Sequence, residues 1–540
     1  MVYRLRKHGS AAQMRFCRDV NARSGNYDFT VLCRNCDKES PDAKLCTLTG
    51  SVPEWLSGSI IYNGPGLNKF GDDEYKHAFD AAALLQKFNI SKGDVTYANR
   101  YLRSKTFEQN SAAGKITKAE FGTPAPADKG MFSRLFDAMD TEKMFSDNTL
   151  VCVTEVNGKH YAMSETPFMT EIDTNTLETQ EKVNINKLLG LMTQSPHPIT
   201  DKKDGSTYTV GMAVGMMGPK YNILKFQAGE NLKKAKVVAS ISSRWRMSPA
   251  YIHSLGMTEN YVIVLEQPMA CSVAEMTSNI VKNAAFIEGL QWHASEPVLF
   301  HVIDRRTWKR VNTRYIADPF FFIHIANSYE DGDHIVMDIP TYKDSSMLQS
   351  MFIKTIRDQK IKNDPEFGNS FKSYMHRVVI PLNTSGGGDN LISLEGSKCT
   401  ATLKGTDVVL SPVQLSDVPM ENPTVNPKIK TLKHRYIWAM GPDPQGGDLG
   451  FVAKVDTSSG ETTKFSEAGL YPSEPVFIPK PNSTDEDDGV IAVLCIKSGD
   501  EKCVLLLILD AASMQEVARG TCSTPGSIPI PLHGHFIPIS

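Results

Sequence analysis

The feature that most constrains this chain is a long succession of short apolar runs separated by turn residues. Runs of this length, rich in β-branched and aromatic residues, are typical of β-strands, whereas amphipathic helical periodicity is rare in the chain. The pattern therefore predicts an all-β protein. It is clearest in six stretches, residues 204–215, 259–268, 297–304, 376–382, 489–496 and 503–510.

A shorter unit recurs within this pattern. An apolar pair and an aspartate are followed by a turn containing Ser or Thr and then by a polar strand, at residues 171–183, 302–311, 454–465 and 508–520. An aspartate that caps its own turn favours a hairpin. Repeated hairpins favour a β-propeller, because radial repetition buries each blade against its neighbours. We expect one propeller domain over residues 26–540, preceded by a basic tail over residues 1–25.

Composition narrows the functional classes. The 540 residues carry a formal net charge of −3 without a long acidic or basic block, so a nucleic-acid-binding surface is not expected. No run of 18 uncharged apolar residues is present, and the basic amino terminus lacks the apolar core of a signal peptide. The ten cysteines are too scattered for a disulfide framework. We therefore expect a cytoplasmic protein with reduced thiols and no membrane span.

Two stretches do show helical periodicity. In residues 131–145 and 345–356 the apolar positions fall on one face, as in an amphipathic helix. Such a face usually packs against a protein core. Arg134 and Lys143 flank the first stripe, which leaves a second interpretation, that this helix lies on a membrane surface. The residues of that candidate surface are Met131, Phe132, Leu135, Phe136 and Met139.

One histidine, His324, stands inside the apolar stretch 319–340. Three consecutive phenylalanines precede it, and the acidic glycine turn 330–333 follows it. We expect two buried strands joined by that turn, with His324 on the first strand. Taken alone, such a histidine is either a core residue satisfied by a hydrogen bond or a metal ligand.

Four histidines lie at the ends of apolar strands: His197, His253, His324 and His533. No HExxH motif, nucleophile elbow, phosphate loop or dinucleotide fingerprint accompanies them. Their contexts, taken in order along nearly the whole chain, resemble the carotenoid cleavage oxygenase family. Further motifs carry the same resemblance: GSIIYNGPGL from Gly58, HAFDAAALLQKF from His77, AEFGT from Ala119, SETPFMTEIDTNTLET from Ser164, HxxNxYED from His324 and YPSEPVFIP from Tyr471.

The resemblance implies a seven-bladed β-propeller in which helices cap the face over an axial iron site. It implies that the four histidines bind a non-haem Fe(II) and leave positions open for O2. Four neutral ligands leave the charge of the ion uncompensated, so carboxylates are expected to accept the remaining ring N–H groups. By the family pattern, the pairs are Glu165 with His253, Glu421 with His324 and Glu474 with His533.

The resemblance also implies a substrate and a reaction. Phe121, Ser164 and Tyr342 match the family's substrate tunnel, although core packing is an alternative role for them. Family members split a conjugated polyene with O2 into two carbonyl products, which requires a dry site rather than an acid and a base. The chain looks most like the animal enzymes that cut centrally to release retinal. We expect it to cleave a carotenoid such as zeaxanthin, lutein or β-carotene at the 15,15' double bond to retinal or 3-hydroxyretinal, with coupled all-trans to 11-cis isomerisation of one half.

Three alternatives stay open at this point. They are central cleavage without isomerisation, a retinoid ester isomerohydrolase, and a propeller that binds a partner without catalysis. Because carotenoids are insoluble in water, their source is a membrane, and the face at residues 131–139 is the candidate docking site. We therefore expect a cytoplasmic protein that associates peripherally with a membrane surface.

Overall fold

The computed structural model describes residues 29–126, 128–362, 364–385, 389–442 and 450–539, so the predicted tail over residues 1–25 lies outside it. In the described residues the strands form seven sheets of four to seven strands and two two-stranded ribbons. The expected all-β class is confirmed. The first sheet contains, in spatial order, β1 (Ser40–Leu45), β7 (Asp94–Tyr101), β6 (Ala82–Ser91), β3 (Gly58–Leu67) and β39 (His533–Pro538).

The next three sheets follow one another along the chain. The second is β11 (Thr179–Asn184), β10 (Phe168–Ile172), β9 (Lys159–Met163) and β8 (Cys152–Val156). The third is β12 (Thr193–Gln194), β14 (Thr207–Gly215), β15 (Gly218–Phe226) and β16 (Lys236–Ser242), with β13 (Ile199–Thr200) beside β14. The fourth is β17 (Gly256–Met257), β18 (Tyr261–Glu266), β21 (Val298–Asp304), β23 (Arg314–Ala317), β28 (Asp407–Ser411) and β27 (Thr400–Lys404), with β22 (Lys309–Arg310) beside β21.

Three sheets and the two ribbons complete the set. One sheet is β24 (Asn327–Asp331), β25 (His334–Tyr342), β26 (Ser373–Pro381) and β29 (Val413–Gln414), and another is β30 (Glu421–Thr424), β31 (Tyr436–Gly441), β32 (Phe451–Asp456) and β33 (Thr462–Phe465). The last is β2 (Thr47–Gly50), β38 (Glu516–Ser523), β37 (Cys503–Asp510), β36 (Gly489–Lys497) and β34 (Leu470–Pro472), with β35 (Val476–Pro479) beside β36. The ribbons pair β4 (Lys69–Phe70) with β5 (Asp73–Glu74) and β19 (Met269–Cys271) with β20 (Leu290–Trp292).

The four predicted aspartate turns all close hairpins. Each aspartate side chain accepts a backbone N–H two or three residues later, at 2.7–2.9 Å. The bond joins residues that are close in sequence, which is why the unit is visible in the sequence. The hairpins are β10–β11, β21–β22, β32–β33 and β37–β38.

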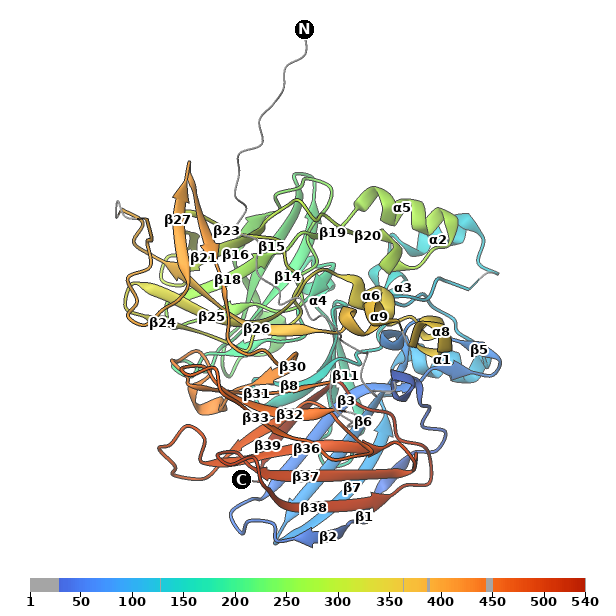
Figure 1. Ribbon diagram of the computed structural model, residues 1–540. Helices are drawn as coiled ribbons and strands as arrows, with labels where there is room; N and C mark the ends of the chain where they lie inside the picture. Colours follow the sequence, from blue (N-terminus) through green and yellow to red (C-terminus); the bar gives the residue numbers. More distant parts are fainter. Residues whose placement is uncertain (1–28, 127, 363, 386–388, 443–449, 540) are drawn as a thin grey trace.

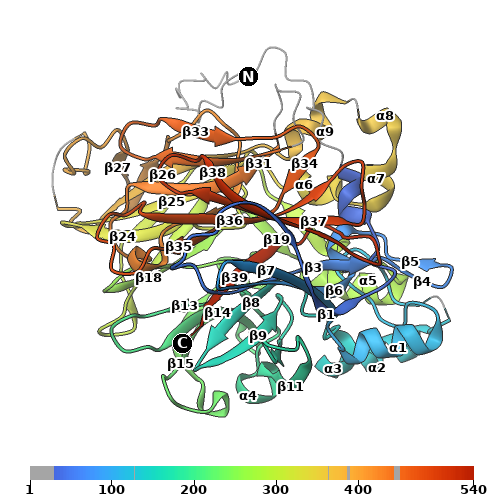
Figure 2. The same cartoon turned by 90° about the horizontal axis from the view of Figure 1, so that it is seen from below.

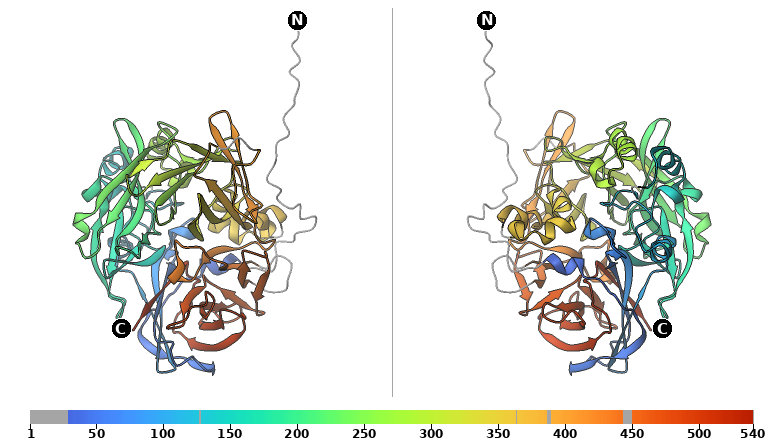
Figure 3. Two further views of the ribbon diagram at one scale, coloured as in Figure 1. Left: turned by 90° about the vertical axis from the view of Figure 1, so that its left-hand side faces the viewer. Right: turned by 90° about the vertical axis from the view of Figure 1, so that its right-hand side faces the viewer.

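The two ends of the described chain are paired with each other. Strand β3 pairs with β39, and β2 pairs with β38, so strands from both ends share two sheets. The two side views in Figure 3 show these N-terminal and C-terminal strands, in blue and red, lying together at the bottom of the molecule. Such pairing joins the last sheet to the first without a separate closing element.

Helices are short, and most of them gather on one side of the molecule (Figure 1). The stretch 131–145 forms two helices instead of one, and so does the stretch 345–356, whose apolar stripe packs into a large core cluster as expected. The helices are α1 (Lys105–Ala113), α2 (Met131–Asp137), α3 (Thr141–Met144), α4 (Ile185–Leu189), α5 (Val273–Lys282), α6 (Ser346–Ser350), α7 (Ile353–Arg357), α8 (Gln359–Lys362) and α9 (Pro365–Ser370). No helix in the described part of the chain is long and apolar enough to cross a membrane.

The stretch 319–340 departs from its prediction. The turn at Gly332 and the strands β24 and β25 on either side of it are present, but β24 begins only at Asn327. His324 therefore lies in irregular backbone, not on a strand, although a bridge between Phe321 and Tyr342 holds the segment that precedes it. A regular strand would keep its side chains perpendicular to the sheet, and the irregular backbone at His324 removes that restriction.

Candidate metal centre

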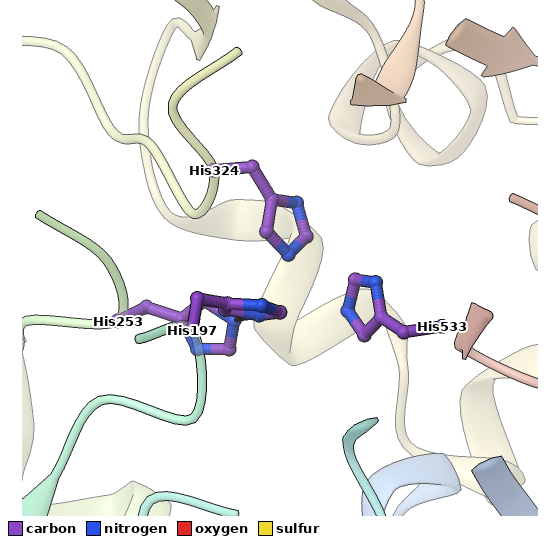
Figure 4. Close-up of side chains that lie close together, drawn as sticks. All are labelled: His197, His253, His324 and His533. Carbon is purple, nitrogen blue, oxygen red and sulfur yellow. Dashed lines mark hydrogen bonds between the residues drawn. The ribbon is translucent and has the colours of Figure 1, made fainter. Parts of the chain in front are cut away.

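The four predicted histidines converge on one point (Figure 4). Each lies next to or within a different sheet. His197 lies between β12 and β13, His253 precedes β17, His324 precedes β24, and His533 is the first residue of β39. One ligand nitrogen of each ring lies within 4.8 Å of those of the other three. The ring centroids of five of the six pairs are 4.6–5.0 Å apart. We call this set the four-histidine cluster.

Three of the rings are held by glutamates on their outer side. The Nδ1 of His253 is 2.7 Å from Glu165 Oε1, and the Nδ1 of His324 is 2.8 Å from Glu421 Oε2. The Nδ1 of His533 is 3.0 Å from Glu474 Oε1. These are the three pairs that the family resemblance in the sequence implied. A carboxylate that accepts the Nδ1 proton fixes the tautomer and leaves Nε2 as the free donor atom of the ring.

The carboxylates have further donors of their own. The Tyr251 hydroxyl donates to Glu165 Oε1 at 2.9 Å, and the Gly534 N–H donates to Glu474 Oε2 at 2.8 Å. The Asn422 N–H donates to Glu421 Oε2 at 2.5 Å. The glutamates are thus themselves fixed in place, and the rings they hold have little freedom to rotate.

Burial determines the charge state of this region. It lowers the pKa of His197 and His324 well below the usual imidazole value, and the neighbouring imidazoles lower it further. Burial also raises the pKa of Glu421 to about 7, despite the hydrogen bond from Asn422. At Glu165 burial acts in the same direction, but His253 outweighs it and brings the pKa down to about 2. Neutral imidazoles are the form that binds a metal ion.

The cluster fits a transition-metal ion. The Nε2 of His324 is buried and has no hydrogen-bond partner among the described residues, and the Nε2 atoms of His197 and His253 are only 2.9 Å apart. A buried ring nitrogen without a partner is costly unless something binds it. Four neutral imidazole donors, surrounded by anions that do not ligate directly, suit iron, zinc or copper better than calcium or magnesium.

A cavity of about 210 Å³ adjoins the cluster. His197, His324 and His533 form part of its wall, and Lys430 and Glu474 add charged groups. The Lys430 ammonium donates to the Ala326 carbonyl at 2.8 Å, and burial lowers its pKa to about 8. Pockets for drug-sized ligands span roughly 300–1,000 Å³, so this polar space suits small molecules rather than a forty-carbon polyene.

The three predicted substrate residues do not line that cavity. Tyr342 is buried in a large apolar cluster, against which Phe121 packs. The same apolar cluster includes Ile323, the residue directly before His324. Ser164 is buried beside Glu165, and its hydroxyl lies 3.0 Å from that of Thr166. The structure therefore places Tyr342 and Phe121 with Ile323 in one large apolar cluster. It places Ser164 directly before Glu165, the residue that holds His253.

Two residues of the site were missed in the sequence. Tyr251 contacts both Glu165 and His253, whose Nδ1 is 3.2 Å from the tyrosine hydroxyl. Its signal was the spacing Tyr-x-His, which places both side chains on one side of an extended segment. Lys430 had no comparable signal, because only the fold brings its ammonium to the cavity.

The chain is similar in sequence to known proteins over nearly its whole length. The family model described as retinal pigment epithelial membrane protein matches residues 33–538. The chain belongs to this family. Carotenoid isomerooxygenase of Galleria mellonella is 34% identical to it over 522 residues, which cover 95% of this chain and 97% of the relative. Beta,beta-carotene 15,15'-dioxygenase of Rattus norvegicus is 34% identical over 523 residues, covering 93% and 90%. The resemblance to the carotenoid cleavage oxygenases is thus confirmed at the level of the family.

Solved structures confirm the fold. The Glu150Asp mutant of Synechocystis apocarotenoid oxygenase superimposes with a TM-score of 0.75 at 20% sequence identity, covering 95% of this chain and all of the other. A cobalt-substituted form of that Synechocystis protein gives a TM-score of 0.75 at 21% identity, with 95% and 98% covered. A likeness at this identity establishes the architecture, and the expected all-β propeller with few helices is confirmed.

Proposed function

We propose that the protein is a non-haem Fe(II) dioxygenase that cleaves a carotenoid at its central 15,15' double bond. The products are retinal or 3-hydroxyretinal, and one of the two halves is converted from all-trans to 11-cis. The observation that carries the proposal is the four-histidine cluster, whose nitrogens converge within 4.8 Å of one another while glutamates hold three of the rings from outside. The curated relatives named for central cleavage and isomerooxygenation support the substrate class.

The four histidines would hold the iron, which supplies an open coordination position where O2 is activated beside the substrate. Glu165, Glu421 and Glu474 keep the rings in the ligating tautomer and balance the charge of the ion. Both oxygen atoms of O2 enter the products, one at each carbon of the broken double bond. No proton has to be added or removed at the reacting carbons, which agrees with the absence of an acid–base dyad motif from the sequence.

The apolar side of the site would receive the polyene. Tyr342 and Phe121 belong to the apolar cluster that reaches Ile323, next to His324. Burial raises the pKa of Tyr342 well above its usual value, and the nearby Glu421 raises it further, so the phenol stays neutral. Neutral aromatic walls exclude water and attract positive charge that develops along a polyene. Ser164 would shape the same space from the segment that carries Glu165.

We also propose that the propeller has seven blades, that helices cap the face over the iron, and that residues 26–540 form one domain. The seven sheets of four or more strands in the described residues support the blade count. The gathering of most helices on one side of the molecule supports the cap (Figure 1). Pairing of β2 and β3 with the C-terminal strands supports a single domain, because neither end forms its sheet alone.

In the decisive experiment, iron-loaded protein is incubated with zeaxanthin and with β-carotene under 18O2. The products are then separated by chromatography that resolves cis and trans isomers. We expect two C20 aldehydes from each substrate, each labelled with one 18O atom, with 11-cis geometry in one of them. All-trans products alone would replace the isomerising reaction with plain central cleavage. Failure of iron-loaded protein to cleave either carotenoid would overturn the proposal.

Membrane docking is the remaining part of the proposal. Phe132, Phe136 and Met139 of the α2 segment expose 72%, 70% and 84% of their surface, and Met131 is exposed as well, whereas Leu135 is only partly exposed. The β14–β15 turn exposes Met216 almost completely. The large apolar side chains gathered on the short segment at α2 suit the interface of a lipid bilayer, which is where the substrate is dissolved.

The double substitution Phe132→Ser and Phe136→Ser tests the docking. We expect less protein to sediment with liposomes and less cleavage of liposomal carotenoid, with iron content and thermal stability unchanged because both rings are exposed. The matched control is the double substitution Leu45→Ser and Leu403→Ser. These two leucines lie on β1 and β27 and are 67% and 56% exposed. Sedimentation equal to that of the control would reject the docking surface.

A further inference from the structure

A second histidine cluster lies at the junction of the first and second sheets. It consists of Glu155, His160 and His535, each of which offers one ligand atom within 4.8 Å of the other two. The imidazole rings of His160 and His535 are 5.4 Å apart between centroids. We call this set the two-histidine cluster. It shares no residue with the four-histidine cluster.

Strand pairing explains why these side chains meet. Glu155 and His160 are opposite each other in the β8–β9 hairpin, whose turn at Asn157 and Gly158 has positive φ at both residues and so fixes the register. The same hairpin places Val153 opposite Ala162. Because side chains alternate along a strand, Val153 and Glu155 lie on one face, and so do His160 and Ala162.

That face packs against β39. Val153 and Ala162 belong to an apolar cluster that includes Ile537 of β39 at its margin. His535 is two residues before Ile537 and therefore lies on the same face of β39, which runs alongside β8 (Figure 2). The apolar side chains form the contact between the two sheets, and the three polar groups lie together at its edge.

The two imidazoles lack hydrogen-bond partners among the residues that the structure describes. Neither His160 nor His535 makes a side-chain hydrogen bond or an ion pair within the described residues, and the Nε2 of His160 is buried and unsatisfied. A ring nitrogen in that condition costs free energy unless a ligand binds it. Two imidazoles and one carboxylate, with water in the remaining position, form a common donor set for Zn²⁺.

We propose that the two-histidine cluster binds a Zn²⁺-like divalent ion, separate from the ion of the four-histidine cluster. Glu155 is exposed at the end of its strand and is free to move the short distance needed for bonds of about 2.0–2.2 Å. Its exposure also provides a path of entry for the ion. The bound ion ties β39 to the β8–β9 hairpin and thereby ties the first sheet, where the N-terminal and C-terminal strands pair, to the second.

Metal stoichiometry tests the proposal. Iron-loaded protein is dialysed against Zn²⁺ at known free concentration and analysed for both metals, in the wild type and in the variants His160→Ala and His535→Ala. We expect about one Zn²⁺ per chain in the wild type beyond the iron, and loss of that zinc in both variants with the iron content unchanged. Glu155→Gln should weaken zinc binding by about tenfold or more, since even indirect partners of metal ligands contribute that much.

Two controls make the result specific. His293→Ala removes another partly buried histidine that belongs to neither cluster, and it should keep the zinc. The His324→Ala variant should keep the one Zn²⁺ per chain that the His160→Ala variant loses. This result separates the proposed site from the four-histidine cluster, whether or not the latter holds iron. Co²⁺ serves as a second probe, because its visible absorption reports the ligand set of a folded protein. Equal zinc binding by the wild type and the His160→Ala variant, or none by the wild type, would overturn the proposal.

Discussion

His533 and His535 lie two residues apart on the same face of β39, yet the clusters they join are built differently. In the four-histidine cluster, three rings have a glutamate on Nδ1, and each of those glutamates accepts a further hydrogen bond. In the two-histidine cluster, no carboxylate or carbonyl holds either described ring, and the one acidic residue is exposed. The first arrangement is fixed before a metal arrives, and the second has to close around it.

This difference bears on what each site can do. Catalysis requires ligands held within about half an ångström of their working positions, and supporting hydrogen bonds provide that precision. A site that only links two strands tolerates looser ligands. We therefore assign chemistry to the four-histidine cluster and a stabilising role to the two-histidine cluster, and the predictions below test that division.

The largest effect is expected from His324→Ala. The substitution removes one of the four proposed ligands and leaves Glu421 buried without its histidine partner, so bound iron and carotenoid cleavage should both fall to background. Elemental analysis and product chromatography measure the two quantities on the same preparation. His535→Ala, on the other cluster, serves as the matched control and should retain both. Wild-type cleavage by His324→Ala would remove the four-histidine cluster from the mechanism.

Glu474→Gln tests the carboxylate that holds His533, whereas the substitution above tests a proposed metal ligand. The amide still offers an oxygen to His533, but the negative charge that favours the ligating tautomer is gone, so iron affinity or activity should fall by about 10- to 100-fold. Competition with a chelator of known affinity measures the change. Glu155→Gln should leave iron affinity unaltered. If the two substitutions alter iron binding equally, the carboxylate of Glu474 does not support iron binding in the way proposed.

A buried histidine with a carboxylate partner need not be a metal site, and His434 shows why. Its Nε2 lies 2.9 Å from Asp338 in an ion-pair contact and its Nδ1 lies 3.1 Å from the Asn327 amide nitrogen, so both nitrogens already face protein groups. Arg377 donates to the same carboxylate at 2.7 and 2.8 Å. Asp338→Ala should lower the free energy of unfolding by about 3–5 kcal/mol, because it leaves a charge buried without its partner. Chemical denaturation measures the loss, and iron per folded chain should stay constant.

The same aspartate contributes to acid stability. Burial opposes its ionisation, but Arg377 and His434 outweigh burial and hold the pKa of Asp338 below the usual carboxylate value. Its contribution is therefore complete above the unfolded pKa of about 4 and is lost as the pH falls through the folded-state value. The stability difference between wild type and Asp338→Asn should shrink as the pH is lowered below about 4. A difference that stays constant over that range would contradict the assignment.

The parts that the sequence predicted are those set by local patterns. Aspartate turns and alternating apolar runs specify hairpins within a few residues, so the all-β class and four turns followed directly. The four histidines were found through resemblance to a family, since their separations in the chain carry no signal of their own. The irregular backbone at His324 was not foreseen, because three phenylalanines indicate a strand and only packing of the sheet ends overrides that preference. The two-histidine cluster was equally hidden, since His535 meets His160 only after the last strand pairs with β3.

Mild chelation should produce the smallest effect on activity while separating the clusters most directly. The proposed zinc site has an exposed carboxylate and unsupported rings, so a chelator reaches the ion and the ligands can leave one at a time. In the four-histidine cluster His253 and His533 are buried, and three of the rings cannot turn away without breaking a hydrogen bond to a glutamate. Brief treatment of protein loaded with both metals should therefore remove zinc first, with iron and cleavage activity nearly unchanged and a lower thermal unfolding midpoint. If iron is lost as fast as zinc, the glutamates do not slow the release of the ligands. The two clusters would then differ only in which residues they contain.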